Sequence, residues 1–137
     1  MPDTLRKVSY FHAMIPDKPG RGAAVMRGLA EAGVNLVAFS AFPNGKKSQL
    51  DFFPADGAAL KRAAKAMNLE LSKAKVGFLY QGDDRVGAMQ RVFDTLAAAK
   101  INITAIDAAT SGKGRFGAIF WVKPKKVARA AKLLKAR

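Results

Sequence analysis

The sequence predicts an α+β protein made of two copies of one small unit, and three observations support this prediction. Half of the 137 residues are hydrophobic, which is enough for a packed core. Stretches with strand-like alternation are interleaved with stretches that have the three-and-four spacing of amphipathic helices. A shift of 67 residues also lays the chain on itself without a gap.

The internal repeat keeps its turns and its helices in register. Between residues 17 and 67, 16 of 51 positions are identical to their counterparts at 84–134. Chance similarity between alanine-rich helices does not explain why turn residues also match. We infer an internal duplication, with a first repeat at 1–74 and a second at 75–137. Three matching pairs of turn and strand-start residues are Asp17 with Asp84, Gly20 with Gly87, and Asn35 with Asn102.

The first repeat is expected to have the order βαββαβ. Its first strand is largely apolar on both faces, as in a strand covered on both sides. A Pro-Gly pair breaks this strand, and Gly33 suits the left-handed end of the helix that follows. Pro43-Asn44-Gly45 predicts a hairpin, and Asp56 can cap the second helix. We expect strands at 7–15, 34–42, 47–53 and 69–72, and helices ending at 32 and spanning 58–67.

The second repeat follows the same order but lacks its last strand, because the counterpart of 69–72 would lie at 136–139, past Arg137. Seven strands are therefore expected, in antiparallel sheets with helices on one face. The strand order 4-1-3-2 would make each repeat ferredoxin-like. Another repeat or a second chain should cover the exposed edge of 75–81. The second repeat's expected strands are 75–81, 101–109 and 115–122, and its helices are 85–99 and a last helix with Pro124 in its first turn.

Composition excludes several classes of protein. No run of about 18 apolar residues exists, so no membrane span is expected. The first residues lack the apolar core of a secretory signal, and the absence of cysteine excludes disulfides and thiol catalysis. Both facts fit a cytoplasmic protein. His12, the single histidine, has no metal-ligating neighbours in sequence, and no Ser/His/Asp spacing supports a nucleophile. We expect no metal, no cofactor and no catalytic residues.

The motifs together resemble the ACT domain, a small regulatory βαββαβ module that binds free amino acids, usually in pairs. Asp17-Lys18-Pro19-Gly20 and Gly33-Val34-Asn35 carry the resemblance in the first repeat. The second repeat departs from the pattern, with Val86 in place of the proline and Lys100 in place of the helix-ending glycine. The resemblance covers nearly the whole chain twice, and implies a stand-alone tandem ACT protein that regulates rather than catalyses.

In ACT pairs the ligand lies between the first loop of one copy and the second-strand start of the other. A helix start offers free N–H groups to a carboxylate, and Asn35 offers both a donor and an acceptor. Asp17 suits an α-amino group. A simple cap, a turn glycine and a helix-end asparagine remain the alternative interpretation. The implied ligand-binding set is Asp17, Lys18, Pro19, Gly20, Arg21 and Gly22 facing Asn102, and Asp84, Arg85, Val86, Gly87 and Ala88 facing Asn35.

The net charge of +14 allows a different function. A basic surface attracts nucleic acid, and the last helix carries a run of cations with no acid among them. Two glycine-rich basic stretches, 18–22 and 111–115, lack P-loop spacing. The expected partners are a free amino acid, a second copy of the chain in a dimer, and a protein target, with a nucleic acid or ligand-free oligomerisation as alternatives. The residues for nucleic-acid contact would be Lys125, Lys126, Arg129, Lys132 and Lys135.

Overall fold

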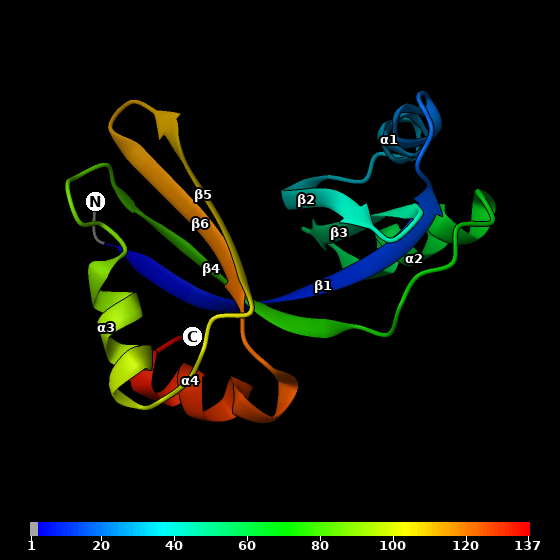
Figure 1. Ribbon diagram of the computed structural model, residues 1–137. Helices are drawn as coiled ribbons and strands as arrows, with labels where there is room; N and C mark the ends of the chain where they lie inside the picture. Colours follow the sequence, from blue (N-terminus) through cyan, green and yellow to red (C-terminus); the bar gives the residue numbers. More distant parts are fainter. Residues whose placement is uncertain (1–2) are drawn as a thin grey trace. The chain divides into compact units, whose positions relative to one another are not determined.

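The computed structural model describes residues 3–137, which form two compact units. One unit is Ser9–Lys75, and the other joins the residues up to Val8 to Val76–Arg137. This division differs from the predicted repeats 1–74 and 75–137 in the first residues of the chain. Each unit is α+β, with an antiparallel sheet and two α-helices (Figure 1).

In the unit Ser9–Lys75, the strands are ordered β2-β3-β1 with antiparallel pairing. Alternate side chains of β1 and β3 meet the helices in one core, in which Phe11 lies opposite Phe52 and packs with Leu29 and Leu60. Helices α1 and α2 contact each other, which places both on one face of the sheet. The elements are β1 (Thr4–Pro16), α1 (Arg21–Glu31), β2 (Leu36–Asn44), β3 (Lys47–Pro54) and α2 (Gly57–Ala66).

The other unit repeats this arrangement with the strand order β1-β4-β6-β5. Its core lies between the sheet and helices α3 and α4, where Phe78, opposite Phe120, packs with Leu96 and Leu134. Figure 1 shows α3 and α4 on the same side of this sheet. The elements are β4 (Lys75–Asp83), α3 (Gln90–Ala98), β5 (Ala105–Gly112), β6 (Arg115–Trp121), the 3₁₀ turn η1 (Pro124–Lys126) and α4 (Val127–Leu134).

The predicted strand at 69–72 is wrong, and the described residues contain six strands instead of seven. This segment is irregular and makes only a local connection to β1, where the Ser72 amide donates to the His12 carbonyl at 2.8 Å. The amide of His12 donates in turn to Ser72 Oγ at 2.9 Å. The Ser72 hydroxyl thus takes the place of a backbone carbonyl as the acceptor for His12, and residues 69–72 do not form a β-ladder with β1.

The edge of β4 is covered by the chain's own N-terminal segment. β1 begins at Thr4, earlier than predicted, and its first residues belong to the unit that contains β4. β1 and β4 are hydrogen-bonded neighbours in the sheet. Arg137 lies beside the same segment, since its amide donates to the Leu5 carbonyl at 3.1 Å and its carbonyl accepts from Lys7 at 3.0 Å.

Two boundaries in the second repeat differ clearly from prediction. α3 begins at Gln90 rather than 85, because Gly87 is left-handed, with φ 76°, and residues 86–89 form turns. β5 begins at Ala105 rather than 101. The predicted cap of α2 is confirmed, as Asp56 Oδ1 accepts from the amides of Ala58 at 3.0 Å and Ala59 at 3.4 Å.

The prediction that the two repeats align without a gap is wrong by one residue at the β5–β6 hairpin. Phe11 and Phe78 are 67 residues apart, but they lie opposite Phe52 and Phe120, which are 68 apart. A β-bulge between Thr110 and Gly112 accounts for the extra residue, because a bulge sets two residues against one on the paired strand. The 67-residue offset returns in the last helix, where buried Ala63 and Ala64 correspond to buried Ala130 and Ala131.

None of the helices in the described part of the chain is long and apolar enough to cross a membrane. Within residues 3–137, no group of three or more His, Cys, Asp or Glu side chains is placed to hold a metal ion.

Candidate functional site

The turn between β1 and α1 is exposed and bends at a left-handed glycine. Gly20 has φ 89° and precedes α1, and the Arg21 amide donates to the Lys18 carbonyl at 3.2 Å. A Cβ added at Gly20 or Gly22 would meet no atom within 4 Å, so the space above this turn is open. The amides of Gly22 and Ala23, in the first turn of α1, have no acceptor inside the helix, which leaves two donors at this turn. Lys18, Pro19 and Arg21 are exposed on the same turn.

Asp17 anchors the turn to the sheet and does not cap the helix. Its Oδ1 accepts a hydrogen bond from Ser48 Oγ at 3.1 Å, and α1 has no side-chain cap. The interpretation of Asp17 as a simple helix cap is therefore wrong. Its carboxylate lies at the exposed start of β3, where Ser48 holds it.

Both asparagines are exposed just before the second strand of their unit. The end of α1 is satisfied by backbone alone, since the Gly33 amide donates to Ala30 at 3.0 Å and the Val34 amide to Leu29 at 2.9 Å. The Asn35 carbonyl accepts from Ala55 at 2.9 Å. Its side chain is thus not needed at the helix end, contrary to the alternative interpretation. Asn102 occupies the matching position before β5.

The turn of the second unit keeps the left-handed glycine but is otherwise different. The Asp84 amide donates to the Gly114 carbonyl at 2.8 Å, and Val86 is fully exposed. Ala88 is buried and its amide donates to the Arg85 carbonyl at 3.2 Å. Residues 84–88 are thus gathered at the start of α3, as 17–22 are at the start of α1. The predicted pairing of each turn with the asparagine of the other repeat joins the two units and stays a prediction.

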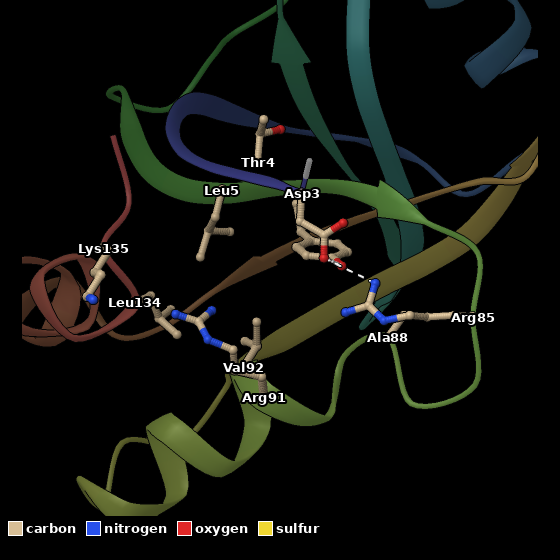
Figure 2. A pocket seen from close by; sticks show the side chains of 10 residues that line it. Asp3, Thr4, Leu5, Arg85, Ala88, Arg91, Val92, Leu134 and Lys135 are labelled. Carbon is tan, nitrogen blue, oxygen red and sulfur yellow. Dashed lines mark hydrogen bonds and ion pairs between the residues drawn. The ribbon is translucent and has the colours of Figure 1, made fainter. Parts of the chain in front are cut away.

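A pocket of about 350 Å³ lies within the unit that contains α3 and α4 (Figure 2). Of the residues predicted to bind the amino acid, only Arg85 and Ala88 line it. Its other lining residues come from the start of β1, β4, the first turn of α3 and the end of α4, and sequence reasoning missed all of them except Lys135, which it placed in a different role. They are Asp3, Thr4, Leu5, Tyr80, Arg91, Val92, Leu134 and Lys135.

The Asp3 carboxylate is the centre of the polar contacts in this pocket. It accepts from Tyr80 Oη at 2.7 Å, from Arg85 Nη1 at 3.1 Å and from the Asp83 amide at 3.3 Å. The hydrogen bond from Tyr80 is the largest cause that lowers the pKa of Asp3, and desolvation opposes it. Burial is the main cause that raises the pKa of Tyr80, and the bond to Asp3 adds to it. Asp3 and Tyr80 are far apart in sequence, so no local motif could have revealed their contact.

A second polar group lies inside the sheet of the unit Ser9–Lys75. Asp51 is fully buried, and its Oδ1 accepts from Gln49 Nε2 at 3.1 Å. Burial, with a smaller contribution from the Asp51 charge, raises the pKa of Tyr10 to about 12. His12 lies opposite Asp51, and its pKa is lowered mainly by burial and then by the charge of Lys75. Asp51 and Tyr10 lie on paired strands of the sheet, whereas His12 also lines an open pocket of about 280 Å³ together with Lys47, Glu70 and Ser72.

The basic residues of the last helix are mostly exposed. Arg129 Nη1 donates to the Ala99 carbonyl at 3.4 Å. The remaining side chains form no ion pair with any residue in the described part of the chain, so their charges face solvent. They are Lys125, Lys126, Lys132 and Lys135, of which Lys126 is half-buried and Lys135 also lines the pocket.

In comparison with known proteins, a family model described as the ACT domain matches residues 79–137. No curated protein matches the sequence significantly. The fold is similar to that of protein BT0572 from Bacteroides thetaiotaomicron, with TM-score 0.82 and 17% identity over 96% of this chain and 88% of that one. It is also similar to the ligand-free regulatory subunit of aspartate kinase from Thermus thermophilus, with TM-score 0.63 and 18% identity over 98% and 95%. The corresponding Thermus flavus subunit gives 0.57 and 19% over 98% and 94%. Identities this low show a shared fold.

Proposed function

We propose that this protein is a non-catalytic regulatory module that binds a free amino acid between its two ACT-like repeats. The observation that carries the proposal is the ACT domain at 79–137, together with a matching unit in which Gly20 takes the left-handed position of Gly87. The aspartate kinase regulatory subunits, which share the fold, give the proposal a precedent in amino-acid metabolism.

The ligand's carboxylate would bind at the first turn of α1, where unsatisfied amides and the positive end of the helix dipole favour an anion. The open space at Gly20 and Gly22 leaves room for the ligand to approach the backbone. Asp17, already held by Ser48, would receive the α-amino group. Asn102 of the other repeat would complete this site, and Asn35 would complete the equivalent site at Gly87.

Regulation would follow from linkage. A ligand that binds one arrangement of the repeats stabilises it by RT ln(1 + [L]/Kd), and shifts the population toward that arrangement. A partner enzyme or a second copy of the chain that prefers the same arrangement would then bind more tightly, with reciprocal effects on ligand affinity.

A thermal-shift screen against the standard amino acids tests the proposal, with Gly22→Asp as the diagnostic variant. Gly22 lies in α1 with ordinary backbone geometry and open space at its Cβ position, so aspartate fits there. The new carboxylate would repel the ligand's carboxylate and take over the helix-start amides. Gly22→Ala is the matched control, because it adds the Cβ without the charge.

We expect one or a few amino acids to raise the melting temperature in moderate salt, Gly22→Asp to reduce that rise by removing the site at the first turn of α1, and Gly22→Ala to keep it. Absence of any amino-acid response, or a response that Gly22→Asp leaves unchanged, would contradict this site. If only nucleic acid stabilised the protein, and this effect collapsed with added salt, the basic face of α4 would be the functional surface instead.

A further inference from the structure

We propose that the pocket between the start of β1, α3 and the end of α4 is a second binding site, for a small organic anion. Its carboxylate or phosphate would lie against Arg91 and Lys135, and its apolar part against Leu5, Val92 and Leu134. This inference goes beyond the proposed function, because the pocket lies within one unit and includes neither asparagine.

The pocket already binds one carboxylate, that of Asp3. A phenol hydroxyl, a guanidinium and a backbone amide all donate to it, which is a set of donors suited to carboxylates. Gly82 makes the approach possible, since a Cβ at this position would collide with the Asp3 carboxylate and the Tyr80 hydroxyl. Asp3 therefore shows that this part of the fold accommodates an anion beside Tyr80 and Arg85.

Two further cationic side chains line the pocket, those of Arg91 and Lys135. Within residues 3–137, the side chains of Arg91 and Lys135 make no hydrogen bond or ion pair. Figure 2 shows the Arg91 guanidinium extending toward Leu134, whereas that of Arg85 extends to Asp3. The lining thus has three cations and one carboxylate, and the positive excess lies beside the buried side chains of Val92 and Leu134. That combination fits an anion with a compact apolar body.

The first repeat shows that the fold does not require these cations. Its counterparts of Arg91 and Lys135 are Ala24 and Asn68. Asn68 and Lys135 both follow a helix in the left-handed region, with φ 56° and 55°. Asparagine adopts that conformation more readily than lysine. The left-handed backbone therefore does not favour lysine at this position; its charge suits the end of the helix dipole, and in our proposal it also binds the ligand.

The test uses three probes that share an isobutyl group and differ in the head group: isovalerate, isobutyl phosphate and the neutral isovaleramide. Binding is measured by isothermal titration calorimetry at constant ionic strength, with the whole chain. The diagnostic variants are Arg91→Gln and Lys135→Gln. Their matched controls are Arg27→Gln on α1 and Lys132→Gln on α4, which remove one exposed positive charge each outside the pocket.

We expect saturable binding of at least one of the two anions, and none of isovaleramide. Arg91→Gln and Lys135→Gln should each weaken binding about ten-fold, as expected for the loss of a charge-assisted hydrogen bond. Arg27→Gln and Lys132→Gln should leave it unchanged. The stronger of the two anions identifies the head group as carboxylate or phosphate.

Failure to bind either anion, equal binding of the amide, or equal losses in the control variants would overturn the proposal. Gly22→Asp separates this site from the amino-acid site, because it lies in the other unit and should not alter isovalerate or isobutyl phosphate binding. The pocket and the amino-acid site at α1 can thus be tested independently of each other.

Discussion

Leu96 on α3 gives a quantitative test of the core beneath the candidate pocket. Its side chain is 0% exposed and packs with Val92, Phe78 and Phe120. Replacement of a buried leucine by alanine costs the lost transfer free energy plus the energy of the cavity, about 3–5 kcal/mol in total. For a chain of this size that loss lowers the melting temperature by about 10–15 °C.

The matched control is Leu133→Ala on α4, because that side chain is 38% exposed and its loss leaves no buried cavity. We expect it to cost less than about 1 kcal/mol. Urea titration followed by far-UV circular dichroism measures both variants. Fluorescence of the single tryptophan, Trp121, reports on the same unit because Trp121 is buried at the end of β6. A cost for Leu96→Ala within about 0.5 kcal/mol of the Leu133→Ala cost would refute this core assignment.

Three further predictions follow from single side chains. Asp56→Ala removes the cap of α2 and should lower the free energy of unfolding by about 1 kcal/mol in denaturant titration, whereas Asp56→Asn should cost little. The lowered pKa of His12 favours neutral imidazole in the folded state, so its contribution to stability is complete above about pH 6.5 and is lost as the pH falls through the folded pKa. As this is the single histidine, His12→Gln should flatten the pH dependence of the melting temperature near pH 6, and an unchanged slope would contradict this. Asp3→Asn removes a carboxylate that raises the pKa of Tyr80, so that pKa should fall in an NMR titration while that of Tyr10 stays near 12.

Much of the fold could be predicted because the duplication reports the same elements twice. Turn glycines, hydrophobic spacing and the Asp56 cap are local signals, and they placed most helices and strands near their observed bounds. Residues 69–72 were predicted to form a strand because their apolar residues alternate as in a strand. In the structure the Ser72 side chain accepts a hydrogen bond from the His12 amide of β1, and no strand forms. The bulge before Gly112 was hidden because Gly112-Lys113 matches Gly45-Lys46 at the 67-residue offset, so the alignment of the two repeats showed no inserted residue at this hairpin.

Of the two candidate sites, the turn residues could be predicted from local sequence and the pocket could not. The turn residues Gly20 and Gly87 were found from sequence because left-handed glycines leave a recognisable pattern. The pocket was not found, because its contacts join residues that only the fold brings together, as Asp3 joins Tyr80 and Arg85. A comparison of the repeats for charge differences would have singled out Arg91, whose counterpart is Ala24.

The position of β1 has a consequence for how the protein is made. On the ribosome, residues Thr4–Val8 are synthesised before residues 9–75, whereas their neighbour β4 and the helices of their unit are synthesised after them. The unit Ser9–Lys75 has its complete core once residue 75 has emerged, whereas residues Thr4–Val8 complete theirs only after residues 76–137 are present. Vectorial synthesis would thus complete the unit Ser9–Lys75 before the unit that contains the pocket beside Asp3.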